Sequence, residues 1–273
     1  MLGLTRRAKR FRSVSVFVFF LLFALGFSDR ALGAEEAAPQ WRLDAGYSQS
    51  RFSKRDQSDW HEETISLNRA LGNGMNAGFF AETSRRYGQD ETSLGLTHAR
   101  PMGAGIIGVF QLSTTPDADF LPRWTASADF DGRVFDWSKA GGGPLVLGLK
   151  IKRKNYVTGD VDNLNPGFTQ YLARGRVWLA ARWINSFERS ISKRLDGYSF
   201  RGDWQALDQF RLFGGYAFAP EADGSDTVDI RTQFSGAVWD LNGTSSLSFN
   251  YAREDRKNSY IRNIFSIGLT RRF

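Results

Sequence analysis

Few side chains in this sequence are of the types that carry out reactions. The chain has no cysteine and only two histidines, His61 and His98. A hydrolase would need one of these histidines beside a serine and an orienting polar group. Neither the GxSxG element of serine hydrolases nor the HExxH element of zinc enzymes occurs in the sequence. We therefore expect no catalytic residues, no metal centre and no cofactor, and an enzyme is the least favoured class of function.

Acidic side chains are the other candidates for chemistry. Asp117 and Asp119, together with the later Asp160 and Asp162, could supply oxygen ligands to a divalent cation. Their spacing matches no calcium-binding loop, so solvated acidic loops are the simpler interpretation. His61 follows Trp60 and precedes two glutamates, which is typical of a solvated rim position.

The elements that must position these side chains are strands. Apolar side chains alternate with polar or small ones in windows such as 41–48, 75–82, 145–152 and 176–183. This period of two is the signature of a β-strand. The sequence predicts about fourteen strands, with twelve as the alternative count. The weakest is the eighth, at 164–173, because Pro166 interrupts it and Gln170 takes a position where an apolar residue is expected.

Strand length and connections favour a closed antiparallel barrel that spans a membrane. The segments are about ten residues or longer, which a tilted strand needs to cross the hydrocarbon layer. Tight turns such as 71–74 and 240–243 alternate with longer charged connections such as 52–59, 116–122 and 157–163. This predicts an all-β fold with short periplasmic turns, longer outer loops and, given an even count, both termini on the periplasmic side.

The alternation predicts a charged lumen and an apolar exterior. A one-residue slip would turn the charges into lipid, at roughly 2–4 kcal/mol for each midplane Arg or Lys. The predicted lumen-lining residues are Arg42, Asp44, Glu82, Asp129, Asp131, Lys150, Arg182, Arg201, Asp203, Arg211, Asp229, Arg231 and Arg262. The same alternation adds Glu62, Lys152 and Arg176, and it assigns Val228, Ile230 and Phe234 to lipid.

Aromatic side chains mark the predicted strand ends. Tryptophan favours a membrane interface because an apolar ring lies beside a polar N–H group. The predicted interface girdle is Trp41, Trp60, Trp124, Trp137, Trp204 and Trp239. In the last segment, Phe265, Ile267, Leu269 and the terminal Phe273 share one parity, which resembles the C-terminal signal that outer-membrane proteins present to the barrel-assembly machinery.

The first 33 residues are predicted to be an export signal. A basic stretch, Arg6–Arg12, precedes an uncharged apolar stretch at 13–27, and Ala31 and Gly33 lie where a signal peptidase cleaves. The predicted organisation is a signal peptide (1–33) cleaved near Gly33, a short periplasmic segment (34–40) and a transmembrane barrel (41–273). The whole chain carries +7, but beyond residue 33 it has 30 basic and 28 acidic residues. That balance gives no reason to expect a nucleic-acid partner.

Two stretches resemble the YaiO family of outer-membrane barrels. These are TTPDADFLPRW (114–124), with its acidic-aromatic run ending in Phe-Leu-Pro-basic-Trp, and SRRYGQDETSLGL (84–96). The resemblance implies an outer-membrane location and, for some relatives, an association with cell-surface polysaccharide systems. It implies no settled activity. Some relatives carry a tetratricopeptide domain before the barrel, for which this chain has no room.

Two functions remain open, with a barrel hydrolase behind them. The first is a narrow, porin-like channel with a charged lumen. The second is a structural or docking component of a polysaccharide system with a closed lumen, in which the outer-loop residues Asp117, Asp119, Phe120 and Arg123 contact the partner. Expected partners are the lipid bilayer with its lipopolysaccharide, the barrel-assembly machinery and a polysaccharide or its export machinery.

Overall fold

The computed structural model describes residues 41–53, 58–103, 105–137, 142–223 and 226–273. The predicted signal peptide (1–33) and short segment (34–40) lie outside these residues. Within the described part of the chain, no helix is long and apolar enough to cross a membrane.

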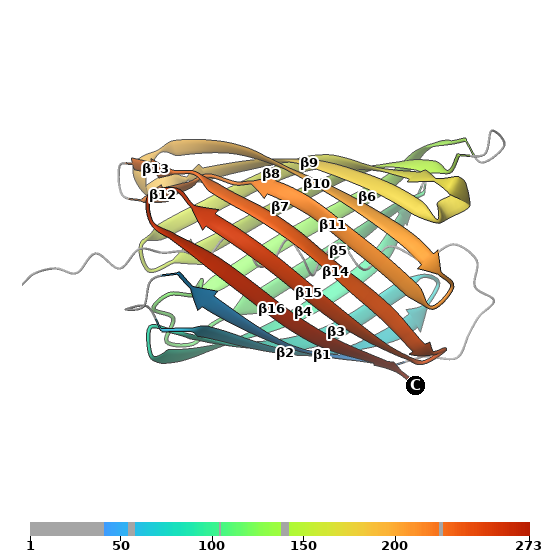
Figure 1. Ribbon diagram of the computed structural model, residues 1–273, viewed down its shortest axis with the longest axis horizontal. Helices are drawn as coiled ribbons and strands as arrows, with labels where there is room; N and C mark the ends of the chain where they lie inside the picture. The colour runs from blue at the N-terminus through green and yellow to red at the C-terminus, as the bar shows by residue number, and fades with distance from the viewer. Residues whose placement is uncertain (1–40, 54–57, 104, 138–141, 224–225) are drawn as a thin grey trace, which may run out of the picture.

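Fourteen antiparallel strands close into one barrel (Figure 1). Each strand pairs with its sequence neighbours, and β1 closes the barrel against β16. The predicted all-β barrel of fourteen strands is therefore confirmed, and the alternative count of twelve is wrong. The strands are β1 (Trp41–Phe52), β2 (Trp60–Gly72), β3 (Met75–Arg86), β4 (Gln89–Gly103), β5 (Ile106–Thr114), β6 (Trp124–Asp136), β7 (Pro144–Tyr156), β8 (Gly159–Leu172), β9 (Val177–Glu188), β10 (Lys193–Leu207), β11 (Phe210–Phe218), β14 (Ile230–Asn242), β15 (Ser245–Arg256) and β16 (Tyr260–Arg272).

Short elements complete the chain. The strands β12 (Glu221–Asp223) and β13 (Asp226–Val228) form a hairpin of their own between β11 and β14. The sequence predicts one strand over 226–239, whereas the structure separates β13 from β14. Single 3-10 turns, η3 (Ala173–Gly175) and η4 (Arg189–Ile191), connect β8 to β9 and β9 to β10.

The two ends of the barrel differ. The terminal rim carries Trp41 and Phe273, whose backbones exchange hydrogen bonds of 2.8 and 3.0 Å. The opposite end, here called the far rim, carries the β12–β13 hairpin and the connection between β5 and β6 (Figure 1). The expectation of a long connection over 157–163 is wrong, because β8 already begins at Gly159 after a tight turn.

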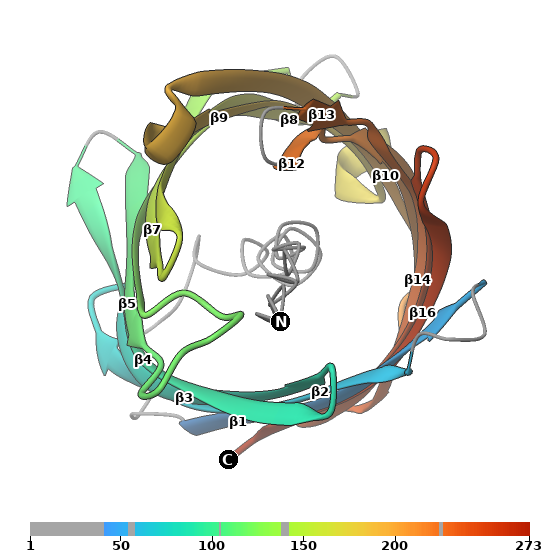
Figure 2. The ribbon, with the colours of Figure 1, turned by 90° about the vertical axis from the view of Figure 1, so that its left-hand side faces the viewer.

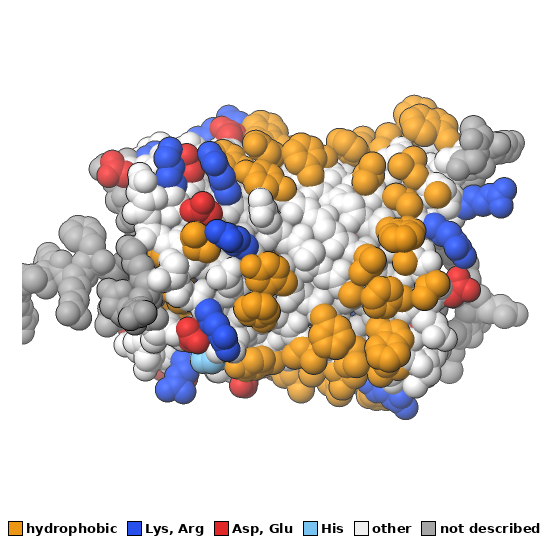
Figure 3. Space-filling view, viewed as in Figure 1, with side chains coloured by type: hydrophobic (Ala, Val, Ile, Leu, Met, Phe, Trp, Pro, Cys, Tyr) orange, Lys and Arg blue, Asp and Glu red, His pale blue; other side chains and the backbone are white. Residues whose placement is uncertain are grey.

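The outer surface carries an apolar belt. On β16, Phe265, Ile267 and Leu269 are 50%, 45% and 46% exposed, whereas the alternate residues Arg262 and Ile264 are 6% and 2% exposed. On the face that Figure 3 shows, apolar side chains gather in two bands, one toward each rim, with backbone and other side chains between them. Because a soluble barrel would bury these side chains instead, the surface is that of a barrel built to lie in lipid.

Pro166 does not end β8, but the pairing of β8 with β9 is interrupted around it. The pairing of β8 with β9 has a gap between Asn163 and Gly167. Proline has no N–H group to donate to a ladder. The Asn165 side-chain oxygen accepts a hydrogen bond of 3.0 Å from the backbone N–H of Asn185. The side chain thus supplies an acceptor where the ladder is interrupted.

Inward phenylalanines lie across glycines of the neighbouring strand. A Cβ atom at Gly95 would lie 2.2 Å from the Phe80 ring, and one at Gly215 would lie 2.4 Å from the Phe234 ring. Both glycines pair directly with these phenylalanines. Their lack of a side chain therefore lets large rings fold flat against the inner wall.

Candidate functional site: the charged lumen

The inward face of the barrel gathers most of the predicted lumen-lining charges. Arg42, Asp44, Glu82, Asp129, Asp131, Lys150, Arg182, Arg201, Asp203, Arg211 and Arg262 all lie at inward positions of their strands, and so do Glu62 and Lys152.

Two predicted lumen residues lie elsewhere. Arg231 is exposed on the outward side of β14, and Asp229, just before that strand, pairs at 3.3 Å with Lys257 of the β15–β16 turn. The prediction failed because Ile230 and Phe234 were assigned to lipid. In the structure Phe234 packs inside with Ala252 and Ile264.

Arg176 is a third exception. It lies exposed in the turn before β9 and pairs with Asp208 at 3.1 Å. It is therefore a residue of the terminal rim and not of the lumen.

Ion pairs hold several of the inward charged side chains in place. Arg201 binds Asp203 through two hydrogen bonds of 2.6 and 2.7 Å, and its guanidinium lies 4.2 Å from the centre of the Phe213 ring. Lys150 reaches Asp129 of the neighbouring strand at 2.6 Å. Such charge-assisted pairs hold each side chain in one orientation.

Trp60 lies inside the barrel and not in the interface girdle. Its ring is 1% exposed. The guanidinium groups of Arg86 and Arg262 lie 4.9 and 5.1 Å from the ring centre. Arg86 also pairs with Glu62, and Arg262 pairs with Glu254 at 2.7 Å. The prediction was wrong because Trp60 takes the inward parity of β2, where paired arginines enclose it.

The other predicted girdle residues are exposed on the outside. Trp41, Trp137, Trp204 and Trp239 lie towards the terminal rim, and Trp124 begins β6 at the far rim. The residues of the predicted assembly signal, Phe265, Ile267, Leu269 and Phe273, are exposed too.

The connection between β5 and β6 folds into the barrel. Figure 2, which views the far rim, shows it as the green loop that reaches over the opening. The Glu91 carboxylate accepts hydrogen bonds of 2.6, 3.0 and 2.8 Å from the backbone N–H groups of Asp119, Phe120 and Leu121. We call residues 115–123 the inner segment.

Burial of Phe120 corrects the predicted contact surface. Its ring is 8% exposed and lies under the guanidinium of Arg86, 5.5 Å away. Phe120 is therefore not offered to an outside partner, because Glu91 draws its backbone inward. Asp117, Asp119 and Arg123 remain exposed.

The β12–β13 hairpin also turns inward over the opening (Figure 2). Glu221 of this hairpin is 6% exposed and receives a hydrogen bond of 2.7 Å from Arg256 of β15. Burial raises the pKa of Glu221 to about 7, although Arg256 opposes the shift. Glu221, one of the carboxyl groups that hold the hairpin, therefore titrates near neutrality. The Glu188 carboxylate also accepts a hydrogen bond from the backbone N–H of Ala222 in β12.

A row of lysines on β7 lines the inner wall of the barrel. Lys150, Lys152 and Lys154 occupy successive inward positions of β7. Lys154 interacts electrostatically with Glu82 of β3 and with Glu221 of the hairpin. Since β3 and β7 are not neighbours, charges approach one another across the lumen at this level. Lys154 shares the parity of Lys150, so alternation alone could have identified it.

The acidic cation-site hypothesis is not supported by the geometry. Asp160 and Asp162 lie on β8 and not on a loop, and they pair with Arg153 and Arg189 at 2.6 Å each. Among the described residues, no three His, Asp or Glu side chains are grouped to hold a metal ion. His61 contacts the Tyr47 hydroxyl at 2.8 Å on the exterior.

Comparisons with known proteins agree on the fold. No protein-family model matches the chain, and no curated protein is significantly similar to it. Among solved structures, the CymD monoaromatic hydrocarbon channel has a TM-score of 0.56 and 10% identity over 88% of this chain and 89% of its own. OccAB4 of Acinetobacter baumannii has a TM-score of 0.51 and 7% identity over 90% of this chain and 100% of its own. At these identities the likeness extends to the fold alone, and the resemblance to the YaiO family stays a prediction.

Proposed function

We propose that this chain forms a narrow channel for small hydrophilic solutes across the outer membrane, with a preference for anions. The row of Lys150, Lys152 and Lys154 along one inner wall carries this proposal. Successive inward residues of a strand are about 6.6 Å apart, so the row places three closely spaced lysines along the passage, of which Lys150 also pairs with Asp129. That CymD is described as a channel agrees with this use of the fold.

The constriction lies at the far rim. The inner segment and the β12–β13 hairpin both reach over the opening there, and Glu91 and Arg256 fix them to the wall. A barrel of fourteen strands is wider than one that its own side chains fill, and narrower than the water-filled porins. We infer that these two elements reduce the remaining passage to the size of small solutes.

The exterior supports an orientation with the far rim outermost. Outward positions near that rim carry paired charges, such as Arg153 with Asp160 and Arg194 with Asp196. On the face that Figure 3 shows, charged side chains also gather toward the far rim, beyond the apolar side chains. The terminal rim has ion pairs of its own, such as Arg176 with Asp208, but it also carries the exposed Trp41, Trp137, Trp204 and Trp239. Anionic lipopolysaccharide head groups would meet the charged ring, and both termini would then be periplasmic.

A charge reversal on one wall tests the proposal. We expect Lys152→Glu, in planar bilayers under a KCl gradient, to shift the reversal potential towards cation selectivity, because the permeating anion loses one cationic step. The matched control is Arg153→Glu, the same charge change on the next residue, which points outward. We expect it to leave the reversal potential nearly unchanged. Equal shifts in both variants, or no current from folded protein, would contradict the proposal.

A further inference from the structure

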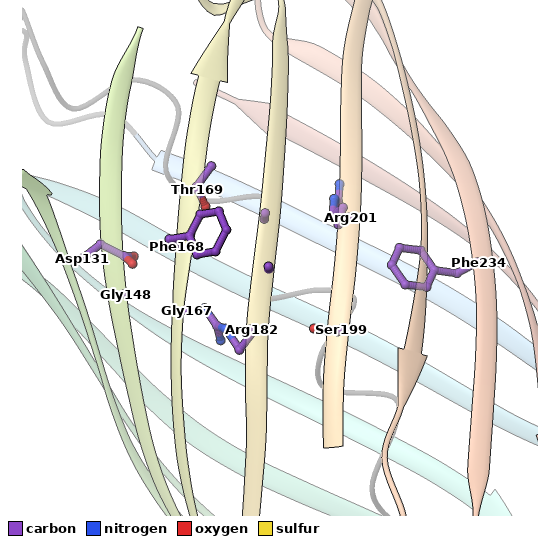
Figure 4. A pocket seen from close by; sticks show the side chains of 11 residues that line it. Asp131, Gly148, Gly167, Phe168, Thr169, Arg182, Ser199, Arg201 and Phe234 are labelled. Carbon is purple, nitrogen blue, oxygen red and sulfur yellow. The ribbon is translucent and has the colours of Figure 1, made fainter. Parts of the chain in front are cut away.

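Two opposite charges face each other across a floor of glycines on the inner wall. Asp131, Gly148, Gly167 and Arg182 are successive cross-strand partners on β6, β7, β8 and β9. Figure 4 shows this part of the wall, with Asp131 at one side, Arg182 at the other and the two glycines between them. All four residues line the same pocket, whose further lining includes Ser199 and Arg201.

The glycines are what keep this pocket open. A Cβ atom at Gly148 would lie 2.7 Å from Asp131 Oδ1 and 3.9 Å from Arg182 Nη2. A Cβ atom at Gly167 would lie 3.2 Å from the Arg182 Cβ and 2.7 Å from the Ala181 carbonyl oxygen. Any larger residue would therefore fill the space into which the carboxylate and the guanidinium both lean.

The two charged groups do not close this gap themselves. The Asp131 carboxylate and the Arg182 guanidinium approach the same point above Gly148. Among the described residues, however, neither group has an ion-pair partner within 4.0 Å. Nearby inward charges behave differently, since Lys150 pairs with Asp129 and Arg201 with Asp203. A carboxylate and a guanidinium held apart over an open floor leave room for a molecule that carries both complementary charges.

We infer that this pocket binds small zwitterions of the α-amino acid class. The solute carboxylate would lie against the Arg182 guanidinium, which presents paired N–H donors to a carboxylate. The solute ammonium would lie against Asp131 and complete the bridge over Gly148. The inference deepens the proposed function, because it names a solute class that the channel would hold on its way along the wall.

The surroundings limit the size of the solute. Ser199 is the cross-strand partner of Arg182, and Arg201 lies on the next inward step with its guanidinium turned to Asp203. The Phe234 ring borders the pocket from the other side. Small side chains, as in glycine or alanine, fit this frame best.

Equilibrium binding of isotope-labelled glycine to the detergent-solubilised barrel tests the inference, with acetate and methylammonium as probes that carry one charge each. We expect glycine to bind, and Asp131→Asn and Arg182→Gln each to weaken it at least about tenfold, since each removes a charged hydrogen bond. Asp131→Asn should not weaken the binding of acetate, because it removes a carboxylate that repels this anion. Because no current is measured, failure of this test is distinguishable from failure of the proposed channel.

Two alanine variants separate the pocket from general effects on folding. Gly148→Ala places a methyl group on the pocket floor and should abolish glycine binding. Gly214→Ala is the matched control, because its Cβ faces outward with the nearest described atom at 3.4 Å. Equal affinities for glycine and acetate, or glycine binding that survives Asp131→Asn and Gly148→Ala in folded protein, would overturn the inference.

Discussion

At the scale of single residues, Trp60 shows how the lumen holds its arginines. The guanidinium groups of Arg86 and Arg262 both lie over the buried ring, and each arginine also has a carboxylate partner. A cation over a desolvated aromatic ring gains about 2 kcal/mol, so the ring and the carboxylates together offset the cost of taking two cations out of water.

Truncation of Trp60 should therefore be costly. We expect Trp60→Ala to lower the free energy of unfolding by about 3–5 kcal/mol, the usual loss for a buried tryptophan. Trp239→Ala is the control, because its ring is 48% exposed on the exterior and should cost less than half as much. Urea unfolding of the barrel in lipid vesicles measures both values. Equal losses would show that Trp60 is not packed as described.

The same residues mark what alternation can and cannot predict. Arg42, Lys150 and Arg201 were placed correctly because a strand puts every second side chain on one face. The orientation of Trp60 and Phe234 was not predictable in this way. Both are apolar, yet they lie inside because arginines or neighbouring glycines accommodate their rings there. Alternation divides the residues of a strand between two faces. It shows which face contacts lipid only where one of the two is clearly apolar.

At the scale of elements, the two parts that narrow the far rim are held differently. Three backbone hydrogen bonds to Glu91 anchor the inner segment. The β12–β13 hairpin has strands of three residues each, and its inward contacts include the Glu221–Arg256 pair and a hydrogen bond from the Ala222 N–H to the Glu188 carboxylate. We therefore expect the hairpin, rather than the inner segment, to respond to conditions.

The hairpin should be sensitive to pH. In the inward position the pKa of Glu221 is raised to about 7 by burial, against a usual value of 4.5. The protonated carboxyl therefore stabilises the inward position fully below about pH 4.5, and this stabilisation is lost as the pH rises through 7. Glu254, Arg256 and Arg262 share its surroundings. We expect conductance to rise between pH 5 and 8, and Glu221→Gln to abolish the rise. A pH response that persists in Glu221→Gln would exclude this origin.

Neither inward-folded element could be read from the sequence. The acidic connection at 116–122 looks like a solvated loop, but Glu91, which is distant in the chain, holds its backbone inward. Similarly, a single long strand over 226–239 hides the break between β13 and β14. The barrel strands themselves were predictable because each satisfies its backbone hydrogen bonds through its immediate neighbours. The loops depend on contacts between residues far apart in sequence.

At the scale of the whole molecule, the types of side chain differ between the exterior and the interior of the barrel, and they also differ along its axis. The exterior is apolar between the rims and charged near the far rim, and the interior carries ion pairs along its length. Closure of β1 against β16 leaves no open edge, which lipid could not satisfy with hydrogen bonds. The strand count and the overall inversion of polarity followed from the sequence, whereas the narrowing of the lumen did not.

Single cysteines along β7 test the inverted arrangement most directly, because the chain has no cysteine of its own. One cysteine is placed at each of Leu149, Lys150, Ile151 and Lys152, and a charged, membrane-impermeant thiol reagent is added during single-channel recording. We predict modification and a stepwise loss of current at 150 and 152, and no reaction at 149 and 151, which face lipid. Modification at 149 and 151 with protection at 150 and 152 would contradict the account.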